Sequence, residues 1–197
     1  GSDRLYLSEV DESDGSIELY TPTVAVLLNV SLDHKSIEEL RRLFGSFVAR
    51  AAVAAINLDD EDSRALGEQA QRRITFAVED QSADIGVEPG TIQDGATSIA
   101  ALLVDRRNRT VHPLRLPMPG RHNVLNALAA IAVARELECG DDQIRLGFAR
   151  FGGVRRRFTL AAAVDGGKIL DDYAHHPGEI RAVLSAARDA VGEHGRV

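Results

Sequence analysis

Two adjacent carboxylates and two adjacent imidazoles flank a tyrosine near the end of the sequence, in the stretch ILDDYAHHPGEI (169–180). The stretch begins as an apolar run that predicts a strand, and side chains at the end of a strand can leave the sheet and converge on a ligand. Neighbouring histidines also occur as metal-binding pairs and as ordinary surface residues. The spacing therefore predicts a site and leaves its ligand open.

Acidic and imidazole side chains follow two other predicted strands. The acidic turn EVDESDGS (9–16) follows a predicted strand over residues 4–9, and the Asp-His pair of NVSLDH follows a predicted strand over residues 23–30. Carboxylate oxygens are ligands that Mg²⁺ prefers, and parallel strands bind ligands at their carboxyl edge. We expect Glu9 and His34 at adjacent strand ends, sharing a Mg²⁺ site. The alternatives are a solvated loop for the acidic turn and a helix cap for the Asp-His pair.

Amides and guanidinium groups form two further candidates. Asn123 and Asn126 are three residues apart, so they share one face of a helix and offer donors and acceptors that suit a purine edge. The segment GVRRRF (153–158) brings three arginines after two glycines, and guanidinium groups bind phosphate oxygens in a bidentate manner. Capping chemistry for the asparagines and a solvated basic linker for the arginines remain as alternatives.

The elements that must position these side chains alternate between strand and helix. The apolar runs 23–30 and 53–60 predict buried strands, and residues 36–51 predict a helix that begins with a capping box of Ser36 and Glu39. A short helix is expected over 61–70. This alternation predicts a parallel, doubly wound α/β sheet.

The later elements predict an antiparallel annex and the start of a second domain. Short alternating strands fill residues 74–118, and helices are expected over 120–138 and 141–151. After the glycines, the strands TLAAAV and KILDDY and a helix starting at Pro177 follow. We expect a first domain over 1–152 and the beginning of a second, Rossmann-like α/β domain over 153–197.

Composition narrows the class of protein. The 197 residues are 44% hydrophobic, which is enough for a sizeable core, and they carry a formal net charge of −7 with dispersed acids. That charge argues against a nucleic-acid-binding surface. The single cysteine excludes a disulfide framework, and no apolar stretch reaches the roughly 18 residues that cross a bilayer. We expect a soluble, intracellular protein without nucleic-acid or membrane partners.

Five stretches resemble, in sequence and in order, the Mur ligases of peptidoglycan synthesis: EVDESDGS, NVSLDH, PGRHNVLNALAAIAVA, GVRRRF and DDYAHHPGEI. The resemblance implies an ATP-dependent, ADP-forming ligase of the bacterial cytoplasm with ATP and Mg²⁺ as cofactors. In the most similar members, the carboxylate of UDP-N-acetylmuramate attacks the γ-phosphate of ATP. The amine of an amino acid, L-alanine in those members, then displaces phosphate from the acyl phosphate.

The resemblance also implies a role for each matching residue. It implies Mg²⁺ ligands at Glu9 and His34, and an arginine that approaches the phosphates at Arg156. It implies ATP contacts to the adenine at His122, Asn123 and Asn126 and to the ribose at Asp172. The implied contacts to the substrate carboxylate and the incoming amino acid are Tyr173, His175 and His176.

Departures from the family pattern keep other functions open. The phosphate loop of the form G-x-x-G-K-[ST] is not found in the sequence, and both ends lie inside predicted domains. We therefore expect this chain to need the remainder of its own protein for the full reaction. A ligase that recycles a ready-made tripeptide and an orphan amide ligase are alternatives among enzymes. A nucleotide-binding or partner-binding module is the alternative that is not an enzyme.

Overall fold

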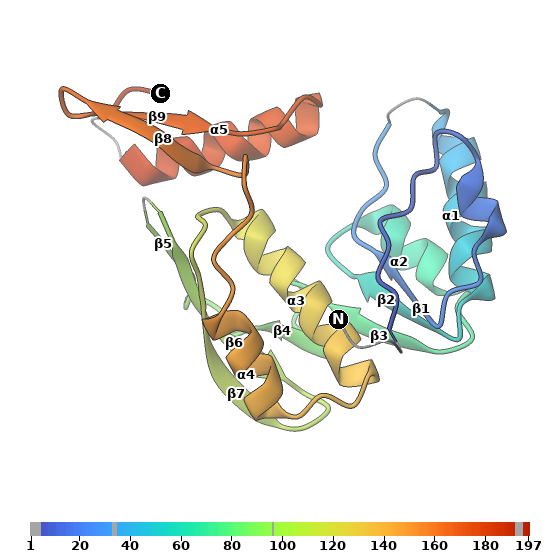
Figure 1. The fold of residues 1–197 in the computed structure, drawn as a ribbon. Helices are drawn as coiled ribbons and strands as arrows, with labels where there is room; N and C mark the ends of the chain where they lie inside the picture. Colours follow the sequence, from blue (N-terminus) through green and yellow to red (C-terminus); the bar gives the residue numbers. More distant parts are fainter. Residues whose placement is uncertain (1–4, 33–34, 96, 192–194) are drawn as a thin grey trace.

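A computed structural model describes residues 5–32, 35–95, 97–191 and 195–197 (Figure 1). The element order begins with the 3₁₀ helix η1 and ends with helix α5. The elements are η1 Ser16–Leu19, β1 Val24–Leu27, α1 Ile37–Arg50, β2 Val53–Asn57, α2 Glu61–Gly67, β3 Arg73–Phe76, β4 Ile85–Val87, β5 Gln93–Asp94, β6 Ile99–Asp105, β7 Thr110–Leu116, α3 Arg121–Glu136, α4 Asp141–Ala149, β8 Thr159–Val164, β9 Gly167–Asp171 and α5 Pro177–Val191.

Seven strands form one mixed sheet in the order β1-β2-β3-β4-β6-β5, with β7 paired to β6. Strands β1 to β4 are parallel, and β6 pairs antiparallel with β4, β5 and β7. The predicted α/β class is confirmed. The antiparallel strands expected within residues 74–118 are confirmed for β5, β6 and β7, whereas β3 and β4, which overlap the same range, still run parallel to β2.

Helices cover both faces of this sheet, which gives three layers. One hydrophobic cluster places the side chains of Val53 and Ala55 against α3, and another places Ala54 and Ile56 with residues of α1 and α2. All five residues of β2 are therefore buried. Burial on both faces explains why β2 is a continuous apolar run rather than an alternating one.

The first helix begins where the sequence predicts. The Ser36 side chain accepts a hydrogen bond from the backbone N–H of Glu39 at 3.2 Å, which satisfies one of the unpaired donors of the first turn. The Glu39 side chain pairs with Lys35 at 3.0 Å, four residues earlier. The Ser36 half of the predicted capping box is thus confirmed, while Glu39 is occupied by a neighbouring charge.

The strand predicted over residues 4–9 is wrong for its described part. Residues 5–10 have no regular secondary structure, and Tyr6 and Leu7 are 89% and 93% exposed. An apolar pattern forms a strand only where a neighbour completes the backbone hydrogen bonds, and no described strand lies beside this segment. Strand β1 is also shorter than expected, ending at Leu27, so that residues 28–32 are free to line a cavity.

The second sheet is a two-stranded hairpin of β8 and β9 packed with α5. Asp165 and Gly166 form its turn with φ values of 48° and 80°, the left-handed pair that a tight hairpin needs. Most of its side chains are exposed, and Ala186 is the buried hydrophobic residue of α5. A Cβ on Gly120 would lie 3.3 Å from that of Ala186, so α5 packs against the turn before α3.

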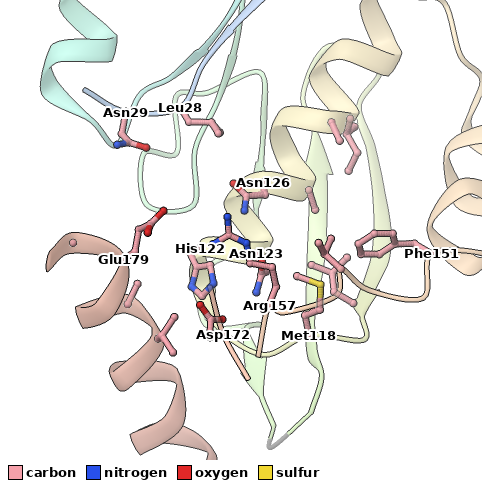
Figure 2. Close-up of a pocket in the computed structure, with 18 of the residues that line it drawn as sticks. Leu28, Asn29, Met118, His122, Asn123, Asn126, Phe151, Arg157, Asp172 and Glu179 are labelled. Atoms are coloured by element: carbon pink, nitrogen blue, oxygen red, sulfur yellow. The ribbon is translucent and has the colours of Figure 1, made fainter. Parts of the chain in front are cut away.

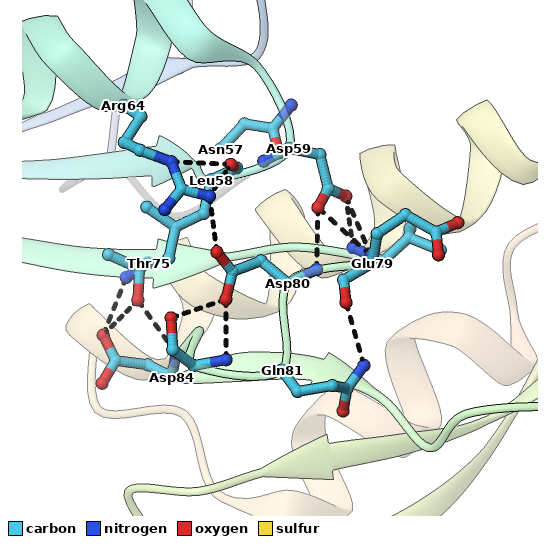
Figure 3. A network of polar contacts seen from close by, with 11 residues as sticks. Asn57, Leu58, Asp59, Arg64, Thr75, Glu79, Asp80, Gln81 and Asp84 are labelled. Carbon is cyan, nitrogen blue, oxygen red and sulfur yellow. Dashed lines mark hydrogen bonds and ion pairs between the residues drawn. The ribbon is translucent and has the colours of Figure 1, made fainter.

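Carboxylates fix the loops at the carboxyl edge of the parallel strands (Figure 3). The Asp59 carboxylate accepts backbone N–H groups from Val78, Glu79 and Asp80 at 2.6 to 3.2 Å. The buried Asn57 side chain donates to the carbonyl of Leu28 at 2.7 Å. These bonds join the ends of β1, β2 and β3, so the edge that faces the cavity is rigid. Within the described residues, no helix is long and apolar enough to span a membrane.

Candidate nucleotide-binding site

A pocket of about 1390 Å³ lies between the seven-stranded sheet and the β8–β9–α5 unit (Figure 2). Its walls come from segments far apart in the sequence, which are the end of β1, the start of α3, α4, the arginine segment and the start of α5. Much of the lining is apolar, and the polar groups gather at one end. Those polar residues include Asn29, His122, Asn123, Asn126, Arg157, Asp172, His176 and Glu179.

The start of α3 is held by a glycine turn. Gly120 has a φ of 96°, and a Cβ at this position would lie 2.6 Å from the His122 ring. The backbone N–H of Gly120 donates to both carboxylate oxygens of Asp94, and the Asn123 side chain donates to the carbonyl of Pro119 at 2.7 Å. The PGRHN sequence thus uses a residue without a side chain so that the imidazole can fold back beside the pocket.

His122 is an uncharged imidazole at neutral pH. Burial lowers the pKa of His122 below its usual value, and the positive charge of Arg157 lowers it further. The carboxylates of Asp172 and Asp94 oppose this shift without reversing it. A neutral imidazole beside two amide side chains suits a polar heterocycle better than it suits a phosphate group.

The arginine segment divides its side chains between two environments. Figure 2 shows Arg157 directed into the pocket near His122, whereas Arg156 lies outside it with its guanidinium carbon 4.7 Å from the centre of the Tyr173 ring. Within the described parts of the chain, no side-chain hydrogen bond or ion pair engages the guanidinium of Arg157. The pocket therefore contains a cation that is available to an anionic ligand.

The histidine pair forms the cap of α5. The Glu179 carboxylate accepts the backbone N–H groups of His175 at 3.1 Å and His176 at 3.4 Å. Burial raises the pKa of Glu179, but these two N–H groups, together with the electrostatic influence of His175 and Arg157, lower that pKa overall. The rings of His175 and His176 lie 4.4 Å apart, and that of Tyr173 contacts His175 edge-on. No metal-pair geometry follows from this arrangement.

Of the two residues predicted to bind Mg²⁺, Glu9 can be located in the structure and does not line the pocket. Glu9 is exposed on the irregular segment, and His34 lies outside the described residues. Asp11 and Asp14 accept the backbone N–H groups of Ser13 and Ser16, as turn residues do. The carboxylate of Glu9 is engaged by no described residue, and Mg²⁺ takes one or two carboxylates together with waters and phosphate oxygens. Among the described residues, no three His, Cys, Asp or Glu side chains are grouped to hold a metal.

The pocket brings together half of the predicted set of residues. His122, Asn123, Asn126, Asp172 and His176 line it, whereas Glu9, Arg156, Tyr173 and His175 do not. Sequence reasoning missed Arg157 and Glu179. Glu179 carried a usable signal, since it stands at the third position of a helix that begins after His176. Three consecutive arginines carry no signal for which one faces the pocket.

Comparison with known proteins identifies relatives over nearly the whole chain. Residues 7–134 match the family model described as Mur ligase middle domain. The UDP-N-acetylmuramate–L-alanine ligases of Chelativorans sp. (strain BNC1) and Rhodopseudomonas palustris (strain BisA53) are 42% and 43% identical to this chain. These alignments cover 96% and 97% of the chain, and 43% of each relative.

A solved structure gives the same result. The UDP-N-acetylmuramate-alanine ligase from Thermotoga maritima superposes with a TM-score of 0.75 at 27% identity, over 92% of this chain and 41% of that one. The chain thus spans well under half the length of the relatives it matches. With the sheet, the pocket and these similarities together, the chain belongs to the Mur ligase family.

Proposed function

We propose that the protein is an ATP-dependent amide ligase of peptidoglycan precursor synthesis, which joins L-alanine to UDP-N-acetylmuramate and releases ADP and phosphate. The observation that carries the proposal is the pocket, where residues of the family's segments meet from both parts of the chain. The 42–43% identity to ligases of this name supports the substrate assignment. The substrates are nucleotide-linked, so we place the reaction in the bacterial cytoplasm.

The adenine of ATP is proposed to bind at the start of α3. Asn126 is exposed to the pocket, and Asn123 beside it is fixed by its bond to Pro119. The neutral His122 completes a surface of donors, acceptors and a ring that can contact a purine without a cost in charge. The rigid edge behind it reduces the entropy lost on binding.

The phosphates are proposed to bind Arg157 rather than Arg156. Arg157 lines the pocket near Glu179, and no described residue forms a side-chain hydrogen bond or a close ion pair with it, while Arg156 is stacked on Tyr173. A guanidinium can offset the negative charge that builds when a carboxylate approaches the γ-phosphate. A bound Mg²⁺, for which Glu9 and His34 are the proposed ligands, would supply further charge neutralisation.

The two proposed domains contribute different residues to the site. We propose a Mur ligase central domain over residues 1–152 and the beginning of the C-terminal domain over 153–197. In this division Asp172, Tyr173, His175 and His176 reach the site from the second domain. The tyrosine and the histidines are proposed to face the muramyl carboxylate and the amino acid. Closure of the two parts would exclude water, which otherwise hydrolyses an acyl phosphate.

Two other functions share part of this evidence. A ligase that attaches a ready-made tripeptide has the same DD-[YF]-AHHP segment, and a binding module without catalysis could keep the pocket. The first differs in the amine it accepts. The second differs in having no turnover of ATP.

The test is turnover by the full-length protein. ADP release should require UDP-N-acetylmuramate and L-alanine together, and mass spectrometry should detect one new amide per ADP. Glycine and L-serine, and the tripeptide L-alanyl-γ-D-glutamyl-diaminopimelate, are the competing amines. If the tripeptide is the one amine that supports ADP release with UDP-N-acetylmuramate, the protein is instead a ligase that recycles the tripeptide. ATP binding without turnover on any acceptor would favour the binding module.

A further inference from the structure

The arginine segment is held in a backbone conformation that its residues do not choose freely. Arg156 has a φ of 57° and Phe158 a φ of 54°, and both positions lie in the left-handed region that non-glycine residues rarely occupy. Such conformations persist only where the surroundings hold them. Arg157 lies between the two, so its direction depends on whatever holds its neighbours.

Two hydrogen bonds from the end of β9 hold both left-handed residues. The backbone N–H of Phe158 donates to Asp172 Oδ2 at 2.8 Å, and the backbone N–H of Tyr173 donates to the carbonyl of Arg156 at 2.8 Å. Asp172 Oδ1 accepts the N–H of Ala174 at 2.8 Å, which fixes the carboxylate itself. Each carboxylate oxygen of Asp172 therefore accepts one backbone N–H.

Three consecutive arginines could present any of their side chains to the pocket. The two hydrogen bonds that hold Phe158 and Arg156, here called the clamp, select one of them. With Phe158 tied to Asp172 and Arg156 tied to Tyr173, Arg157 points into the pocket beside His122 (Figure 2). Arg156 does not line the pocket, and its guanidinium lies over the Tyr173 ring. The contacts that select Arg157 are the bond from the Phe158 N–H to the Asp172 carboxylate and the bond from the Tyr173 N–H to the Arg156 carbonyl.

We propose that Asp172 is a positioning residue for Arg157. It stabilises the left-handed turn of the arginine segment and thereby aims the guanidinium at the site of the ATP phosphates. This inference rests on the proposed nucleotide function for its consequence in catalysis, although the clamp itself needs no ligand. It differs from a role confined to the ribose, in which Asp172 would act only on the nucleotide, because a carboxylate oxygen that accepts one backbone N–H can still accept a ribose hydroxyl.

The two roles give opposite results in a double-mutant cycle on the full-length protein. If Asp172 acts through Arg157, then Asp172→Ala and Arg157→Ala should each lower kcat/KM for ATP by roughly ten- to hundred-fold, as expected for a lost charged hydrogen bond. The double variant should then be no worse than the more damaged single variant. A loss of roughly tenfold or more in Asp172→Ala should also remain with 2′,3′-dideoxy-ATP, which has no ribose hydroxyls.

A role confined to the ribose contact would reverse both outcomes. The effects of Asp172→Ala and Arg157→Ala would then multiply, and the penalty of Asp172→Ala would vanish with 2′,3′-dideoxy-ATP. Either result would overturn the positioning role. Asp171→Ala is the matched control, because Asp171 is the adjacent carboxylate and lies 3.9 Å from Arg156. It should change kcat/KM for ATP less than threefold.

A second measurement keeps the inference separate from the proposed function. Amide hydrogen exchange without nucleotide should show Phe158 and Ala174 protected in the wild-type protein and exchanging at least tenfold faster in Asp172→Ala and Asp172→Asn. Unchanged protection of Phe158 would overturn the clamp even if the protein is an active ligase. Faster exchange in a protein that turns over no ATP would keep the clamp and reject the ligase function instead.

Discussion

The two walls of the pocket are stabilised in different ways. The wall that carries His122 and Asn123 stands on a seven-stranded sheet with buried clusters on both faces. The wall that carries Asp172 and His176 belongs to a hairpin and a helix in which Ala186 is the buried hydrophobic residue among those described. Packing fixes the first wall, whereas hydrogen bonds to single carboxylates fix the second. Polar bonds exchange more readily with water than a packed core does, so the second wall is the one suited to move.

The largest expected effect compares one residue type in the two regions. Ile56 of β2 is fully buried and Ile169 of β9 is 57% exposed. We expect Ile56→Ala to lower the free energy of unfolding by about 2–5 kcal/mol, since it leaves a cavity in the core. We expect Ile169→Ala to lower it by less than about 1 kcal/mol. Urea unfolding followed by circular dichroism measures both, and equal losses would remove the difference between the walls.

Two glycines sharpen the comparison at the pocket itself. Gly120→Ala places a Cβ against the His122 ring at a φ of 96°, so we expect a loss of about 1–3 kcal/mol in stability and a displaced imidazole. Gly147→Ala in α4 meets nothing within 4 Å and should stabilise its helix by about 0.5–1 kcal/mol. Unfolding experiments and the His122 ring signals in NMR spectra report these changes. If Gly120→Ala leaves the free energy of unfolding unchanged, the turn before α3 is not constrained.

The dependence of stability on pH tests the burial of His122. The pKa of His122 is below 6.5 in the folded protein, so the unfolded chain binds more protons just below pH 6.5. The contribution of the uncharged His122 ring to the free energy of unfolding is fully present above pH 6.5, and it declines as the pH falls towards the folded-state pKa. His122→Gln should make the free energy of unfolding less dependent on pH in that window. If the free energy of unfolding depends on pH equally in the wild-type protein and in His122→Gln between pH 6.5 and pH 5, the burial of His122 is contradicted.

The smallest expected effect lies in the carboxylate network behind the first wall. Hydrogen bonds from Ser82 and then from Arg64 lower the pKa of Asp80 to about 2. Ser82→Ala, which removes the hydroxyl hydrogen bond and keeps the backbone N–H, and Arg64→Ala should each raise this pKa, as measured by NMR titration. The group stabilises the fold above pH 3.8, and this contribution is lost as the pH falls through about 2. At neutral pH, Arg64→Ala should cost no more than about 1 kcal/mol because its ion pair is partly exposed to solvent. An unchanged pKa of Asp80 in either variant would contradict the contribution of that residue.

The sequence predicts the elements of the molecule better than their partners. Apolar runs and the Ser36 cap are local signals, and the structure has both of them. The strand before Glu9 and the orientation of β3 depend on which chain segment lies alongside, and no local pattern records that. A three-residue strand such as β4 is equally compatible with a parallel and an antiparallel neighbour.

The candidate site shows the same limit at the level of single residues. Helix periodicity and Gly120 place the asparagines and His122 at the start of α3, where they line the pocket. The selection of Arg157 among three identical neighbours depends on two left-handed φ values and on a carboxylate 15 residues further along the chain. Composition and spacing carry no trace of that selection, because all three side chains have the same chemistry.

Amide hydrogen exchange of the full-length protein with and without a non-hydrolysable ATP analogue tests the central claim most directly. The account holds that one nucleotide binds both walls of the pocket. It predicts that the analogue slows exchange at residues 120–126 and also at residues 156–158 and 172–176. Slower exchange in the first segment alone, or in neither, would contradict a nucleotide site shared between the two regions.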